Sequence, residues 1–145
     1  MTSIQIISKN LRKISNLYNR LLVKQFSALD LDNYVEILLI ISAQEHPHTQ
    51  NQLAELFQID KVRMVNILFN LSQKGLIEIA RNPADRREHL VYLTPKAETI
   101  IPAIRDMLNQ TTLLAQDGIT KDKLICCFEV LKAMEKNLIN VLTEK

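Results

Sequence analysis

The stretch from residue 49 to residue 94 constrains the fold most, because it carries start and stop signals for two helices and then changes its apolar period. Thr49 and Gln52 form a capping box that starts a first, short helix. Asp60 can cap a second helix, and Gly75 supplies the left-handed residue that commonly ends a helix. Two short helices in this order predict a helix-turn-helix.

The second helix is expected to have one buried and one outward face. Apolar residues recur at three-and-four spacing on the side expected to be buried, namely Met64, Ile67, Leu68 and Leu71. The polar residues expected to face outward are Lys61, Arg63, Asn66 and Asn70. A basic, amide-bearing face of this kind is typical of a helix that enters the major groove of DNA.

After the glycine, apolar residues alternate, which predicts two strands. The first strand contains Ile77 and Ile79, and the second contains Val91 and Leu93. The connection at residues 82–87 is polar and basic, so we expect it to project from the surface as a wing. Three arginines lie at or near its tip: Arg81, Arg86 and Arg87. Arginine can enter the narrow minor groove while a helix occupies the major groove.

At these positions the chain resembles the MarR family of winged-helix transcriptional regulators. The matching segments are Gln52-Leu53-Ala54, Lys74-Gly75-Leu76-Ile77, Asn82-Pro83-Ala84-Asp85-Arg86-Arg87 and Val91-Tyr92-Leu93-Thr94-Pro95-Lys96. The Asp-x-Arg wing followed by a Val-x-Leu-Thr strand is the most specific part. The resemblance implies a mainly α fold with a small β-hairpin wing, in which Asp85 braces the wing and Arg87 reaches the minor groove.

The outward face of the second helix departs from the family pattern. The family usually has small hydroxyl residues and an arginine where this chain has Val62, Arg63, Val65 and Asn66, and an acidic position becomes Phe69. The three apolar side chains predict a stripe on a face that is usually polar. Valine can contact a thymine methyl group, which leaves hydrogen bonding to the bases to Lys61, Arg63 and Asn66.

Charge is unevenly distributed, although the chain carries a formal net charge of only +2. Residues 61–87 hold six Lys or Arg against two acids, whereas residues 30–60 hold six acids and no Lys or Arg. A basic block of this kind fits phosphate binding at a defined surface. Residues 1–29 add five bases and no acid. They indicate either an ordinary solvated surface or contact with flanking DNA.

Both ends of the chain carry a seven-residue apolar repeat. We expect the two repeats to pack across a two-fold axis as a homodimer; the alternative is burial within one domain. The residues expected at the dimer interface are Ile4, Ile7, Leu11, Ile14, Leu124, Leu131, Leu138 and Val141. Such a dimer would hold two recognition helices roughly 34 Å apart and select a pseudo-palindromic site in double-stranded DNA.

The chain divides most simply into one domain, residues 1–145, with a winged-helix head at 30–94 and a helical dimerisation region at 1–29 and 95–145. A connecting helix is expected from Pro95 to about Gln116, with Pro102 as a candidate hinge. The MarR resemblance implies a small phenolic or other aromatic acid bound between head and dimerisation region. Candidate aromatic residues for that pocket are Tyr18, Phe26 and Tyr34, with core packing as the alternative for each.

Catalysis, cofactors and membrane insertion are not expected. The chain has only two glycines, which excludes a phosphate-cradling glycine loop, and it has no nucleophile motif. Three scattered histidines, His46, His48 and His89, fall short of a zinc signature, so no metal site is predicted. The longest apolar run, residues 35–43, is far shorter than the roughly 20 residues of a spanning helix. With no signal-peptide pattern, we expect a cytoplasmic protein.

The adjacent residues Cys126 and Cys127 cannot build a disulfide framework. The apolar repeat predicts that Cys127 lies in the core, and Cys126 is either a plain surface residue or a redox-sensitive thiol.

Two functions of different kind remain open. The first is a dimeric, sequence-specific DNA-binding transcriptional regulator, expected to be a repressor relieved by a small ligand. Its expected DNA contacts are Thr49 and Gln50 to phosphate, Lys61, Val62, Arg63, Val65 and Asn66 in the major groove, and Arg86 and Arg87 at the minor groove. The second is a winged-helix interaction module with weakened DNA binding that holds a protein partner through Val62, Val65 and Phe69.

Overall fold

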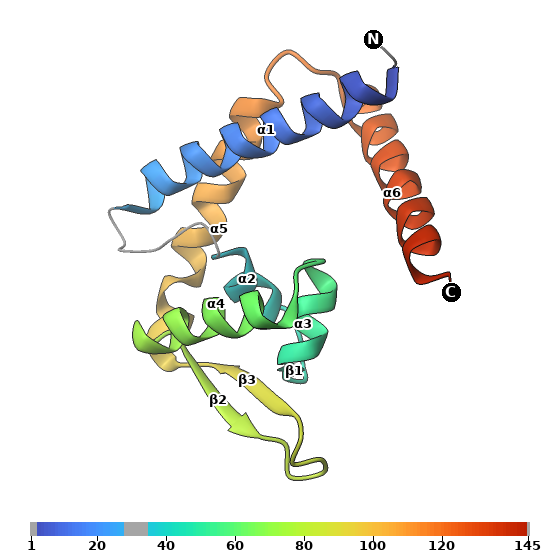
Figure 1. Cartoon of the computed structure of the whole chain (residues 1–145). Helices are drawn as coiled ribbons and strands as arrows, with labels where there is room; N and C mark the ends of the chain where they lie inside the picture. Colours follow the sequence, from blue (N-terminus) through green and yellow to red (C-terminus); the bar gives the residue numbers. More distant parts are fainter. Residues whose placement is uncertain (1–2, 28–34, 145) are drawn as a thin grey trace. The chain divides into compact units, whose positions relative to one another are not determined.

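The computed structural model describes residues 3–27 and 35–144, without the side chains of residues 3–5. Tyr34 and the side chain of Ile4 therefore lie outside the described residues. The chain forms two compact units, Met1–Thr111 and Thr112–Lys145, and each is described here by itself. Figure 1 shows helices and one small sheet, so the predicted mainly α fold with a β-hairpin is confirmed.

The first unit contains most of the regular elements. In chain order they are α1 Ser3–Phe26, α2 Glu36–Ser42, β1 His48–Thr49, α3 Gln50–Leu56, α4 Lys61–Gln73, β2 Ile77–Arg81, β3 His89–Leu93 and α5 Pro95–Ala115, whose last residues pass into the second unit. The second unit contains α6, Lys121–Thr143. Helices α3 and α4 are the two helices of the predicted helix-turn-helix, and β2 and β3 are the predicted hairpin (Figure 1).

Side-chain caps fix the starts of α3 and α4. The Thr49 hydroxyl accepts a hydrogen bond from the Gln52 amide at 3.1 Å, and the Gln52 side chain accepts one from the Thr49 amide at 2.9 Å. The Asp60 carboxylate accepts a bond from the Arg63 amide at 2.7 Å. These contacts satisfy amides that the first turn of a helix leaves without partners. Both predicted caps are thus confirmed, as is the positive φ of Gly75, +71°.

The sheet has three antiparallel strands in the order β1-β3-β2. In the hairpin Ile77 lies opposite Leu93, and Ile79 lies opposite Val91. The third strand, β1, was not predicted because it has only two residues and Thr49 also serves as the cap of α3. It occupies the free edge of β3 and pairs His48 with Val91. This pairing fixes the entry to the helix-turn-helix against the hairpin.

The core of the first unit lies between the helix-turn-helix, the sheet, α2 and parts of α1 and α5. It contains Leu22, Phe26, Val35, Ile37, Leu38, Ile41, Leu53, Ala54, Met64, Ile67, Leu68, Leu71, Leu76, Ile77, Val91, Ala97, Ile101 and Ile104. The predicted buried face of α4 is therefore confirmed. Helix α2 was not predicted; Val35, at its start, makes no side-chain cap, so only an apolar run marks it in the sequence. Desolvation raises the pKa of the Glu36 carboxyl at its first position above the ordinary value.

Helix α5 begins where it was predicted to begin and is attached directly to the end of α4. The Thr94 hydroxyl accepts a bond from the Ala97 amide at 3.2 Å and donates one to the Gly75 carbonyl at 2.6 Å. The Lys96 ammonium donates to the Lys74 carbonyl at 2.8 Å. Lys96 thus satisfies one of the carbonyls that the end of α4 leaves free. Pro102 lies within the helix, as predicted.

Helix α6 starts at the predicted cap, Thr120, whose hydroxyl accepts a bond from the Lys123 amide at 3.4 Å. Gly118, before it, has a φ of +76°. Helix α6 has no buried residue. The prediction that Cys127 lies in the core of the chain is therefore wrong: Cys127 and Cys126 are both exposed, because this unit contains no core for a side chain to enter.

Candidate nucleic-acid interface

The outward face of α4 presents apolar and polar side chains together. Met64, Ile67, Leu68 and Leu71 bury the opposite face. On the outward face Val62 is 72% exposed, Val65 46% and Phe69 58%, values that are unusual for large apolar side chains. Lys61, Arg63, Asn66 and Asn70 are also exposed. The structure therefore brings the predicted base-contacting side chains to one accessible surface.

The start of α3 holds the two residues predicted to contact phosphate. Gln50 is half-buried at the first position of the helix, next to the open amides of its first turn. Thr49 is buried, with 7% of its surface exposed, and its hydroxyl is engaged in the capping box. Gln50 is thus the more accessible of the two, and the Thr49 side chain serves as the N-cap of α3.

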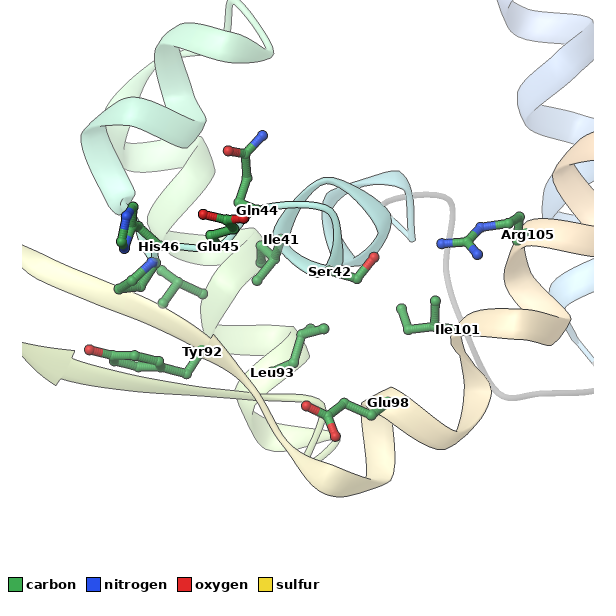
Figure 2. Close-up of a pocket in the computed structure, with 12 residues that line it drawn as sticks. Ile41, Ser42, Gln44, Glu45, His46, Tyr92, Leu93, Glu98, Ile101 and Arg105 are labelled. Carbon is green, nitrogen blue, oxygen red and sulfur yellow. The ribbon is translucent and has the colours of Figure 1, made fainter.

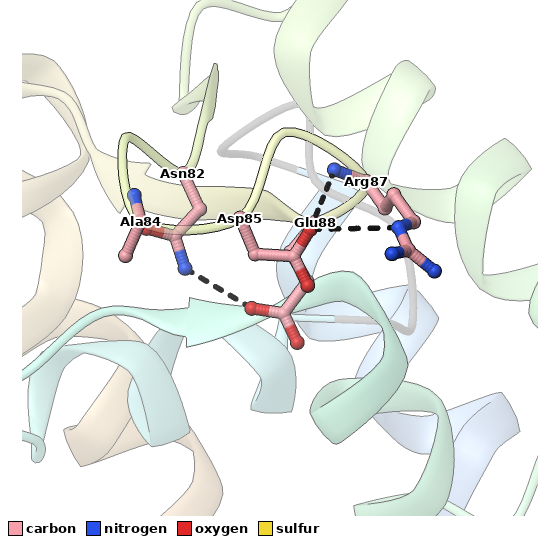
Figure 3. A network of polar contacts seen from close by, with 5 residues as sticks. All are labelled: Asn82, Ala84, Asp85, Arg87 and Glu88. Atoms are coloured by element: carbon pink, nitrogen blue, oxygen red, sulfur yellow. Dashed lines mark hydrogen bonds and ion pairs between the residues drawn. The ribbon is translucent and has the colours of Figure 1, made fainter.

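The wing loop is closed by its own polar groups, as Figure 3 shows. The Asn82 side chain donates to the Glu88 carboxylate at 3.0 Å and accepts from the Ala84 amide at 3.0 Å. The Asp85 carboxylate accepts from the Arg87 amide at 3.0 Å. Backbone bonds join Asn82 to Glu88 and Glu88 to Asp85 at 2.9 and 3.0 Å. All of these hydrogen bonds join residues of the loop and its two ends, residues 82–88.

Asp85 holds the wing mainly through the backbone of Arg87. The Arg87 Nε lies 3.9 Å from the Asp85 carboxylate, and the Arg87 side chain is 95% exposed. An ion pair so open to water contributes little to stability. The Arg87 guanidinium therefore stays available to an external anion, together with exposed Arg86 at the tip and exposed Arg81 at the end of β2. The Asn82–Glu88 contact was not predicted, because residues six apart in a loop carry no periodic signal.

A separate pocket of about 510 Å³ lies in the first unit, beside β3 and the start of α5 (Figure 2). Its walls come from the end of α2, the following loop, β3 and α5. The lining residues are Ile41, Ser42, Gln44, Glu45, His46, Pro47, Val91, Tyr92, Leu93, Glu98, Ile101 and Arg105. Arg105 contributes a guanidinium group to the pocket from α5, and Tyr92 contributes a phenol ring from β3.

Neither Tyr18 nor Phe26, two of the three aromatic residues predicted for a ligand pocket, lines this one. Phe26 is completely buried in the core, which is the alternative that the sequence left open for it. Tyr18 is half-buried on α1, and Tyr34 lies outside the described residues. Tyr92 was missed as a candidate because its place in an alternating strand marks it only as solvent-facing.

The predicted dimer residues are mostly exposed. On α1, Ile7 is 44% exposed, Leu11 41% and Ile14 52%. On α6, Leu138 is 61% exposed and Val141 68%, while Leu131 is also exposed and Leu124 is half-buried. The side chain of Ile4 lies outside the described residues. Both helices thus carry apolar surface that their own unit does not cover.

Within the described ranges, no group of His, Cys, Asp or Glu residues is arranged to hold a metal ion. None of the helices in residues 3–27 and 35–144 combines the length and apolarity that crossing a bilayer requires.

Comparison with known proteins shows that the chain is similar to transcriptional regulators of the MarR family. Residues 32–88 match the model of the MarR family. A MarR transcriptional regulator from Methanosarcina mazei Go1 is 17% identical, with a TM-score of 0.86 over 94% of this chain and 99% of that chain. A putative MarR family regulator from Listeria monocytogenes, complexed with a 26mer DNA, is 20% identical, with a TM-score of 0.84 over 97% and 91%.

A mutant MarR from E. coli complexed with operator DNA is 23% identical, with a TM-score of 0.81 over 90% of this chain and 94% of that chain. At these identities the structural likeness establishes the fold. Together with the family match, it confirms the resemblance that the wing and helix motifs indicated.

Proposed function

We propose that this chain, whose residues 32–88 form a MarR family domain, is a dimeric transcriptional regulator that binds double-stranded DNA. The observation that carries the proposal is the pairing of an accessible α4 face with a self-braced, arginine-bearing wing in one unit. Two structures of the same fold, from Listeria monocytogenes and E. coli, are complexes with DNA.

In this proposal α4 lies in the major groove and the wing lies over the neighbouring minor groove. Lys61, Arg63 and Asn66 supply hydrogen bonds to base edges or phosphate. Arg86 and Arg87 enter or flank the minor groove, whose negative potential attracts arginine. Gln50, with Thr49 behind it, contacts phosphate at the start of α3.

The exposed apolar surfaces of α1 and α6 support the proposal of a dimer. Leu138 and Val141 are more than half exposed, and a second copy of the chain is the simplest partner to cover them. A two-fold axis would present two α4 helices to one face of DNA, roughly 34 Å apart, and so select a pseudo-palindromic operator.

We further propose that the regulator is a repressor released by a small phenolic or other aromatic acid. The pocket beside β3 is a candidate place for such a ligand, since Arg105 can pair with a carboxylate and Tyr92 and Ile101 supply apolar surface for a ring, although Glu45 and Glu98 also line it. A ligand that binds one arrangement of the two DNA-binding surfaces more tightly than the other would shift the protein toward that arrangement. The resulting change in DNA affinity is limited by the difference between the ligand's affinities for the two arrangements. Action on chromosomal DNA accords with the cytoplasmic location expected from the sequence.

The test is binding of the full chain to a library of duplexes at two salt concentrations. We expect a selected inverted repeat and a steep salt dependence. Arg87→Ala should weaken binding and reduce the salt slope by about one. Lys132→Ala is the matched control, because it removes one cation from α6, far along the chain from the wing, where the ammonium only meets Glu135 at 3.4 Å. Weak binding to all sequences with no salt dependence would overturn the proposal.

The exposed apolar stripe on α4 favours a second candidate, a winged-helix module that holds a protein partner. Under that function Phe69→Ser would abolish capture of the partner, and Arg87→Ala would leave it unchanged. The duplex library separates the two functions, because only the first predicts a selected DNA sequence.

A further inference from the structure

The centre of the outward face of α4 is apolar. Successive helix residues are roughly 100° apart around the axis, so the residues most directly opposite a buried face can be read from their spacing. Opposite the buried side chains of Met64 and Leu71 stand Val62 and Phe69, with Val65 beside them. We call Val62, Val65 and Phe69 the apolar stripe. It is the part of α4 that projects furthest from the core.

Polar residues flank the apolar stripe on both sides. Lys61 lies on one flank, and Arg63 and Asn70 lie on the other. Asn66 and Gln73 are the amides within the central arc, and both are exposed. If α4 enters a groove, the apolar stripe faces the floor of the groove and the cations face its walls.

DNA matches this distribution better than an apolar protein surface does. Phosphates line the walls of the major groove, where they can pair with Lys61 and Arg63. On the groove floor, the thymine C5-methyl group is the one apolar group that a base pair presents. An apolar protein partner would cover the stripe but offer no counter-charge to Lys61 or to the wing residues Arg86 and Arg87.

We infer that α4 reads thymine through its C5-methyl groups, with Val62 and Val65 as the specificity-determining residues and Phe69 extending the contact by one turn. This inference rests on the proposed DNA-binding function and names the bases that the operator must supply. Each half-site should carry thymines at the positions facing the apolar stripe, on either strand. Hydrogen bonding by Asn66 and Arg63 would add to this apolar code.

The experiment removes single methyl groups from the DNA. The duplex selected by the full chain is synthesised with each thymine replaced in turn by deoxyuridine, which lacks only the C5-methyl group. At positions facing the stripe we expect affinity to fall roughly fourfold per methyl. At all other thymines the affinity should not change.

Protein variants assign the effect to the stripe. Val62→Ala and Val65→Ala should weaken binding to the thymine duplex and reduce the deoxyuridine penalty at the positions each valine contacts. Val65→Thr, which keeps one methyl group and the branched shape, should retain part of that penalty. Arg87→Ala serves as the contrast: it should weaken binding to both duplexes equally and leave their ratio unchanged. Circular dichroism checks that these exposed substitutions leave the helices intact.

The outcomes distinguish failure of this inference from failure of the proposed DNA-binding function. Selected, salt-dependent binding with no deoxyuridine penalty at any position overturns methyl reading and leaves the proposed function standing. A penalty that persists unchanged in both alanine variants overturns the assignment to Val62 and Val65. Failure of the full chain to bind any duplex at low salt overturns both this inference and the proposed function.

Discussion

The helix-turn-helix and α6 use their apolar residues in opposite ways. In the first unit, Leu68 and Met64 on α4 have no exposed surface at all. In the second, Leu138 and Val141 are more than half exposed, and no residue of α6 is buried. The head therefore completes its core within its own unit, whereas the apolar residues of α6 are not covered by theirs. Folded proteins rarely leave a long apolar stripe in water, and this supports the proposal that a second copy of the chain covers α6.

The largest effect is expected from a charge on the apolar repeat of α6. Leu138→Glu should convert the dimer to a monomer and lower DNA affinity by about 100-fold or more, because each head would then bind its half-site independently. Light scattering reports the mass, and fluorescence anisotropy reports the affinity. Ala133→Glu is the matched control, with the same added charge on the opposite side of the helix. A dimer that survives Leu138→Glu would remove the need for a partner at this surface.

Removal of buried side chains sharpens the difference between the two regions. Leu68→Ala should lower the free energy of unfolding by about 2–5 kcal/mol, since it leaves a cavity in a close-packed core. In urea unfolding, this loss of stability should be the same at every protein concentration when a spectroscopic probe placed in the head is used to follow the head alone. Leu138→Ala makes the same truncation on α6, and its cost should depend on protein concentration. Equal, concentration-independent costs would contradict the comparison.

Each region contains one glycine with a left-handed backbone conformation, whose substitution tests the cost of that conformation. Gly75 and Gly118 have φ values of +71° and +76°, and a Cβ would meet nothing closer than 3.9 Å at Gly75 and nothing within 4 Å at Gly118. Alanine at either position should therefore cost about 1–2 kcal/mol through backbone conformation alone. Thermal unfolding measures both. Asparagine, which tolerates the left-handed region, should restore part of the loss; a cost that asparagine does not reduce would point to a steric cause.

The smallest effects are expected from two exposed ion pairs of the described residues, Asp85–Arg87 in the first unit and Lys132–Glu135 in the second. Asp85→Asn in the wing and Glu135→Gln in α6 should each change the free energy of unfolding by less than about 0.5 kcal/mol, because water screens both pairs. The asparagine side-chain oxygen can still accept the bond from the Arg87 amide. A loss greater than about 1 kcal/mol in chemical denaturation would show that charge, and not this hydrogen bond, holds the wing.

Local signals explain how much of the head the sequence could predict. The caps at Thr49 and Asp60 and the stop at Gly75 depend on neighbouring residues, so the bounds of α3 and α4 follow from the sequence. Strand β1 escaped prediction because its two residues are paired by β3, more than forty positions later. Helix α2 escaped because an apolar run without a side-chain cap fits a buried strand as well as a helix.

The candidate interface was predictable for a similar reason. Helical spacing alone places Val62 and Val65 on the outward face, and their exposure agrees with it. The pocket was not predictable, since Ser42, Tyr92 and Arg105 come from three separate elements that only the tertiary fold brings together. The proposed contacts of α6 with a second chain would involve two surfaces, and a sequence pattern does not say which residues of the two surfaces pair.

The link between α4 and α5 has a mechanical consequence. Thr94 and Lys96 bond the first turn of α5 to the carbonyls of Gly75 and Lys74. The chain also connects α4 to α5 through β2 and β3. A rotation of the first turn of α5 should therefore also rotate the C-terminal end of α4. In the proposed DNA complex, such a rotation would change the angle between α4 and the duplex while leaving the side chains of its outward face as they are.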